Sequence, residues 1–181
     1  MLTALILLIV IVYIIIKLYQ KTEVIGNWSH LIPDIQHDPN AFYELVENNL
    51  RDKQVPDFKS NKITISEGGL LSYNRLYLEI SRGQYIFHIC ASPWGTGFFF
   101  SWWARQKMDD IDELLILIPF IGSRIIKMRQ HQSYYKLDTD SMFRKSVHQC
   151  VLAAVDSLTS AKGIRGLSEL ERTPDVRSMI K

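Results

Sequence analysis

The chain has 181 residues, of which 47% are hydrophobic and 22% are charged, and it is long enough to bury one core. The formal net charge of +2 is too small to indicate a nucleic-acid surface, and no basic stripe with interleaved aromatic residues is present. Two cysteines, Cys90 and Cys150, exclude a disulfide framework and a four-thiolate zinc site. We therefore expect one domain without a metal, a cofactor or a nucleic-acid partner.

Residues 1–19 are apolar almost without interruption as far as Lys17, which is typical of a membrane-spanning helix. At about 1.5 Å per residue, such a helix covers roughly 27 Å, close to the ~30 Å hydrocarbon core of a bilayer. The segment lacks the basic start and the cleavage site of a secretory signal, so it predicts a retained, single-pass anchor. Lys17 and Lys21 lie on its C-terminal side, which places the N-terminus outside and the following domain in the cytoplasm.

Residues 20–37 have the character of a juxtamembrane connector, because glycine and proline interrupt them. Trp28 within this stretch suits the headgroup layer, so we expect it to contact the membrane. The domain itself is expected to span residues 38–172, and residues 173–181 form a polar tail.

A helix is predicted at the start of this domain. Asp38 can cap it, Pro39 suits its first turn, and apolar residues recur at helical spacing as far as Leu50. The apolar period then changes to two, which predicts strands. If Arg82 and Gly83 form a two-residue hairpin loop, the buried face of that hairpin pairs Leu78 with Phe87.

The opposite face of this hairpin gathers Tyr77, Glu79, His88 and Cys90, with Tyr77 opposite His88. An imidazole near a carboxylate and a thiol can supply a general base and a nucleophile. These four residues are therefore the candidate catalytic residues of a membrane-tethered hydrolase or transferase. The alternative, which we favour, is a covered sheet face without chemistry, because a cysteine in a strand is usually a small core residue.

The loop 91–97 follows this hairpin, and its candidate ligand residues are Trp94, Gly95, Thr96 and Gly97. It is too short for a phosphate-binding loop and precedes an aromatic strand rather than a helix. If this loop instead binds a small molecule, these four residues form the ligand site of a small-molecule sensor.

Residues 98–103, FFFSWW, place aromatic side chains on both faces of a strand. Either this is a central strand covered on both sides, or Trp102 and Trp103 touch lipid. Similarly, the apolar run 114–121 is followed by cations and is either a buried segment or a membrane-surface segment. In the membrane-surface hypothesis, the cations on the headgroups are Arg124, Lys127 and Arg129.

In the last third of the domain, the sequence pattern predicts a strand over residues 133–137 and then a long helix. Asp138 and Asp140 can cap this helix, and Gly163 ends it.

Three sequence segments resemble those of a known family: GTGFFFSWW (95–103), YYKLDTDSMF (134–143) and GIRGLSELER (163–172). They cover about the C-terminal half of the chain and resemble a family of hypothetical bacterial proteins. The resemblance implies a bacterial source, and hence the inner membrane, but no activity.

The combined expectation is an α+β fold, with an antiparallel β-meander covered by helices, on a single N-terminal transmembrane helix. We expect a non-enzymatic interaction module that faces the cytoplasm and belongs to a multi-protein system at the inner membrane. Its expected partners are the lipid bilayer and either another protein or further copies of itself. The hydrolase or transferase and the small-ligand sensor remain the alternatives.

Overall fold

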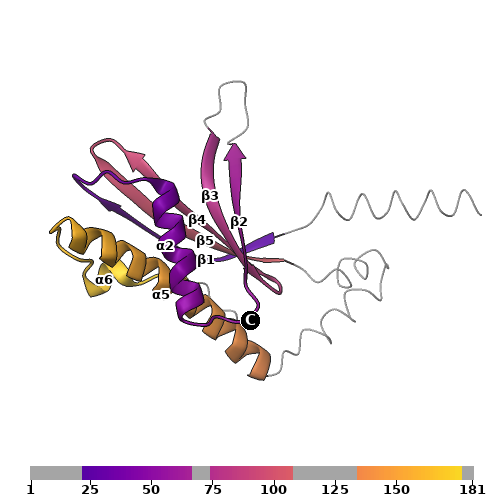
Figure 1. The fold of residues 1–181 in the computed structure, drawn as a ribbon. Coiled ribbons are helices and arrows are strands. Elements are labelled where there is room, and N and C mark those ends of the chain that lie inside the picture. The colour runs from indigo at the N-terminus through magenta and orange to yellow at the C-terminus, as the bar shows by residue number, and fades with distance from the viewer. Residues whose placement is uncertain (1–21, 67–73, 108–133, 177–181) are drawn as a thin grey trace, which may run out of the picture.

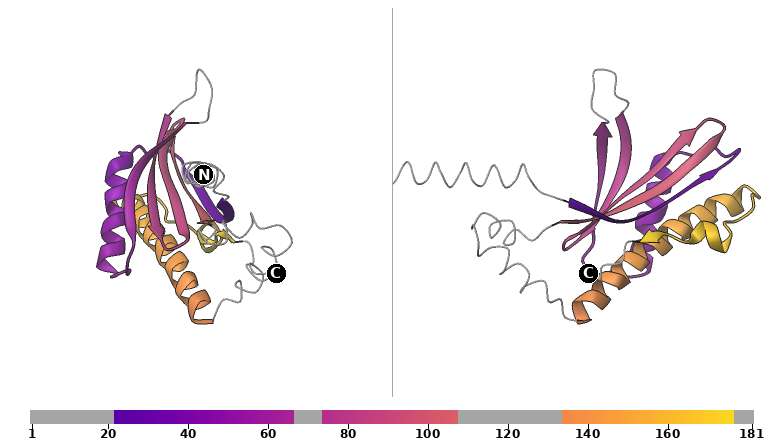
Figure 2. Two further views of the ribbon diagram at one scale, coloured as in Figure 1. Left: turned by 90° about the vertical axis from the view of Figure 1, so that its right-hand side faces the viewer. Right: turned by 180° about the vertical axis from the view of Figure 1, so that it is seen from behind.

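A computed structural model describes residues 22–66, 74–107 and 134–176, and this part of the chain forms an α+β fold (Figure 1). The strands form one antiparallel sheet in the order β2-β3-β4-β5-β1-β6. Helices α2 and α5 pack against each other on one face of this sheet (Figure 2). The predicted α+β class, with an antiparallel meander under helices, is confirmed. The elements are β1 (Thr22–Ile32), α2 (Pro39–Asp52), β2 (Lys59–Ser66), β3 (Asn74–Arg82), β4 (Tyr85–Trp94), β5 (Gly97–Lys107), α5 (Tyr134–Ala161), α6 (Glu169–Arg172) and β6 (Asp175–Val176).

Strand β1 corrects the predicted connector over residues 20–37. Residues 22–32 pair along their length with β5, so they belong to the domain rather than to a linker. A β-bulge between Val24 and Gly26 shifts the register by one residue. As a result Ile25 and Trp28 both reach the core although they are three positions apart. Because the bulge breaks the alternation of buried and exposed side chains, the sequence pattern does not predict this strand.

Helix α2 begins as predicted. The side chain of Asp38 accepts a hydrogen bond from the backbone N–H of Asn40 at 3.0 Å, and Pro39 occupies the first turn. The buried stripe lies against the sheet, and its members are Phe42, Tyr43, Val46 and Leu50.

The β3–β4 hairpin has the predicted faces but a different register. Arg82 pairs with Tyr85, so the two-residue loop is Gly83-Gln84 instead of Arg82-Gly83. Gly83 has a φ of 56°, which suits glycine at the first central position of a type II′ turn. Leu78 therefore pairs with Ile89 rather than with Phe87. Because the shift is two residues, each side chain remains on its predicted face.

The sheet divides between β3 and β4. Their pairing ends at Tyr77 and Cys90, and beyond this point β2 and β3 turn away from β4, β5 and β1 (Figure 1). Tyr43 of α2 lies at the division. Its hydroxyl donates to the carbonyl of Leu76 at 2.7 Å and accepts from the N–H of Ala91 at 3.1 Å. One side chain thus satisfies the two backbone groups that the separated strands no longer pair.

Helix α5 corrects the strand predicted over residues 133–137, because the helix already begins at Tyr134. Tyr134 and Tyr135 are 87% and 82% exposed, so they occupy a free first turn of the helix and have no place in the sheet. The core stripe of α5 includes Phe143, Val147, Val151 and Val155. Gly163, with a φ of 64°, follows the end of the helix.

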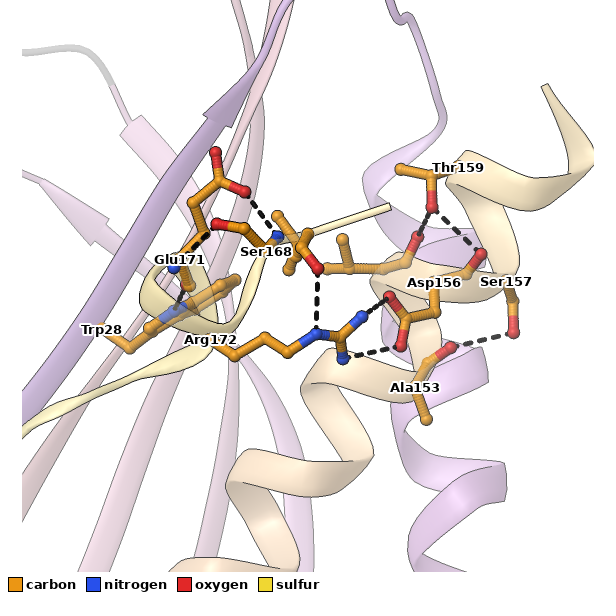
Figure 3. A network of polar contacts seen from close by, with 10 residues as sticks. Trp28, Ala153, Asp156, Ser157, Thr159, Ser168, Glu171 and Arg172 are labelled. Carbon is orange, nitrogen blue, oxygen red and sulfur yellow. Dashed lines mark hydrogen bonds and ion pairs between the residues drawn. The ribbon is translucent and has the colours of Figure 1, made fainter. Parts of the chain in front are cut away.

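The C-terminal segment is fixed against both the sheet and α5. Arg172 makes two hydrogen bonds to the carboxylate of Asp156, at 2.7 and 3.0 Å (Figure 3). The indole N–H of Trp28 donates to the backbone carbonyl of Glu171 at 2.7 Å. His148 joins the same region, because its Nε2 donates to the carbonyl of Arg172 at 2.8 Å. These contacts hold α6 over β1 and exclude solvent from Trp28.

Candidate functional site

The sheet face opposite α2 and α5 is here called the outer face. Within the described ranges no helix covers it (Figure 2). Strand pairing places Tyr77, Cys90, Ser101 and Ser29 in one row across it. The next row contains Glu79, His88, Trp103 and Asn27.

Large apolar side chains are exposed at both sides of this face. Trp103 on β5 and Leu31 on β1 are 45% and 44% exposed, and Ile65 on β2 is 38% exposed. Sequence reasoning did not identify Leu31, because β1 was not recognised as a strand. Once β1 is paired, Leu31 lies opposite Phe99 on the same face as Trp103.

The predicted polar cluster does form at the centre of the outer face. Tyr77 lies opposite Cys90 and Glu79 opposite His88, so the predicted Tyr77–His88 pair is replaced. His88 Nε2 lies 3.2 Å from the Glu79 carboxylate. The structure therefore brings all four candidate catalytic residues onto one surface, as two cross-strand pairs.

The surroundings of Cys90 do not activate its thiol as a nucleophile. Cys90 is 1% exposed, and burial raises the pKa of its thiol, which keeps it protonated near neutral pH. Burial likewise raises the pKa of Tyr77. No hydrogen bond joins His88 to Cys90 in the described part of the chain. The cluster is best explained as a layer of paired polar groups within the sheet face.

The glycine-rich loop closes the β4–β5 hairpin. Trp94 pairs with Gly97, so Gly95 and Thr96 form a two-residue turn. Gly95 has a φ of 60°, and a Cβ on Gly97 would lie 2.6 Å from the carbonyl oxygen of Ile32. Both glycines are therefore required by the backbone. Trp94 is 65% exposed at the tip of the hairpin.

The predicted membrane contacts divide into three groups. Trp28 and Trp102 are each 3% exposed and pack in the core, which corrects their assignment as lipid contacts. Trp103 is accessible. The other predicted contacts, Arg124, Lys127 and Arg129, lie outside the described residues, as do the segment 114–121 and the anchor 1–19.

Within residues 22–66, 74–107 and 134–176, no helix has both the length and the apolar character that crossing a bilayer requires. No group of three potential metal-ligating side chains is present in these ranges.

No protein-family model, no curated protein and no solved structure matches the chain.

Proposed function

We propose that the protein is a membrane-anchored, non-enzymatic interaction module whose outer face binds a partner protein at the cytoplasmic side of a bacterial inner membrane. The observation that carries this proposal is the exposure of Leu31 and Trp103, and of Ile65 on the diverging part of β2, on a sheet face that no helix of the described residues covers. A single exposed apolar residue needs no explanation, but several on one face are typical of an interaction site.

The composition of the face favours a protein partner over lipid. Its centre contains the Glu79–His88 pair, and both side chains are partly exposed. Hydrocarbon would remove water from these groups without offering hydrogen bonds, which is costly. A protein surface can instead pair with them while it covers Trp103 and Leu31. Tryptophan and tyrosine are also enriched at protein interfaces, so Trp103 and Tyr77 suit this role.

The anchor is the second part of the proposal, and it rests on the apolar length of residues 1–19 and on the lysines that follow. In a bacterial host, alkaline phosphatase fused to the C-terminus should be inactive, because the enzyme needs the periplasm. A green fluorescent protein at the same position should fluoresce and sediment with membranes. Active phosphatase, or a mature N-terminus beyond residue 20, would show that the proposed topology is wrong.

Binding by the outer face is tested by placing charge on it. Changing Leu31 and Trp103 to glutamate in the full-length chain should lower the amount of partner that co-purifies from membranes by about tenfold or more, since each carboxylate would lose water in the interface. Met142→Glu is the matched control, because Met142 is 60% exposed on α5 and lies away from the outer face. Equal recovery with Met142→Glu and with the double variant would contradict the proposal.

A further inference from the structure

A cavity of about 160 Å³ lies on the other side of the sheet, between its core face and α5. Its apolar walls come from Ile25 of β1, Phe87 of β4, and Trp102 and Ala104 of β5. This volume is close to that of a cavity of about 150 Å³ that can hold benzene. The cavity can therefore accept an apolar group of roughly six carbon atoms, but it cannot bury a long acyl chain.

Arg144 of α5 is one of the residues that line this cavity. Its Nε and Nη1 atoms are shielded from solvent, and neither has a hydrogen-bond partner in the described part of the chain. An unpaired buried donor is unfavourable, and more so when the group is charged. The guanidinium is therefore a cation with unused hydrogen-bonding capacity beside an apolar cavity.

The electrostatics around the cavity favour an anion. Lys145 also lines it, and none of the described lining residues is acidic. His148 is already engaged at both ring nitrogens, because its Nδ1 accepts from Trp102 and its Nε2 donates to the carbonyl of Arg172. Asp140, one turn before Arg144, accepts a hydrogen bond from Tyr85. Of the two cations that line the cavity, Arg144 has the shielded nitrogens without a hydrogen-bond partner among the described residues, so it is the group best placed to bind an anion.

We propose that this cavity binds a small monocarboxylate with a compact apolar body, whose carboxylate pairs with Arg144 and whose body packs on Phe87 and Trp102. Arginine suits a carboxylate because its planar, permanently charged fork makes strong charge-assisted hydrogen bonds. The site is separate from the outer face, so it can be tested without knowledge of a protein partner.

The probe is benzoate, which combines a six-carbon ring with one carboxylate. In a ligand-observed NMR titration of the full-length protein in nanodiscs, with empty nanodiscs as the background, we expect saturable binding. Benzyl alcohol, which has a similar shape but no charge, should bind about tenfold more weakly or not at all. Arg144→Gln should weaken benzoate binding by about tenfold or more. Arg51→Gln, which removes an exposed arginine from α2, should change it by less than about twofold.

A second variant keeps the test valid if Arg144→Gln alters the fold. Ser141 of α5 also lines the cavity, and Ser141→Leu should block benzoate while Arg144 remains in place. Absence of benzoate binding to the unaltered protein, or binding unchanged by both Arg144→Gln and Ser141→Leu, would overturn the proposal.

Discussion

Replacing Leu78 with aspartate should destabilise the domain by about 4 kcal/mol or more, because it buries a charge without a partner. Leu78 is 0% exposed and pairs with Ile89 at the centre of the core face. The measurement is the thermal midpoint of the full-length protein in detergent micelles, followed by circular dichroism. A loss this large would remove much of the stability of an ordinary domain, so we expect low recovery of folded protein.

The neighbouring residue supplies the control. Glu79 points to the outer face and contacts His88 there, with its side chain 25% exposed. Glu79→Ala should therefore change stability by only about 1 kcal/mol, as is usual for partly exposed charge pairs. Equal effects of the two substitutions on the thermal midpoint would mean that the faces of β3 are assigned incorrectly.

Replacing Trp28 with alanine should destabilise the domain by about 3–5 kcal/mol, the usual range for a large buried aromatic residue. Trp28 is 3% exposed, and its indole N–H donates to the carbonyl of Glu171. The substitution removes this hydrogen bond together with the packing between β1 and the C-terminal segment. Denaturant unfolding of the full-length protein in micelles measures the loss.

Trp103→Ala is the matched control, since Trp103 is 45% exposed on the outer face. We expect it to lower stability by roughly 1 kcal/mol, because about half of the side chain remains in contact with solvent. If Trp28→Ala were as mild as Trp103→Ala, the burial of Trp28 in the core would be contradicted.

The sequence is sufficient to predict those elements in which one local pattern of residues dominates. Asp38 and Pro39 identify the start of α2, and the alternation over residues 75–81 identifies both faces of β3. The hairpin register was predicted two residues away from its position. The type II′ preference for glycine at the first loop position, which Gly83 satisfies, was the signal that could have corrected it.

Elements that depend on distant partners could not be predicted in this way. In β1 the bulge near Gly26 breaks the alternation, and the burial of Trp28 depends on Glu171 at the other end of the chain. The first turn of α5 resembles a strand because Tyr134 and Tyr135 favour strands by composition. The helix forms there because this exposed turn extends a helix whose later turns pack in the core, and adding a turn to an existing helix outweighs a weak local preference.

The same distinction applies to the candidate site. Alternation alone placed His88 and Cys90 on one face, and the structure has them on that face. Pairing across the sheet was needed to add Leu31 from β1 to the surface around Trp103. Burial was needed to show that the Cys90 thiol is shielded and has a raised pKa. Arg144 beside its cavity had no sequence signal, because only the three-dimensional structure shows that its Nε and Nη1 are shielded and lack a hydrogen-bond partner among the described residues.

The most direct test of the proposed interaction is photo-crosslinking in intact bacterial cells that produce the full-length protein. A photoreactive amino acid replaces Trp103 on the outer face or, as the control, Met142 on α5, both of which are exposed. Our account predicts a discrete protein adduct from position 103 that is absent from position 142. Adducts to lipid alone at position 103, or the same protein adducts from both positions, would contradict it.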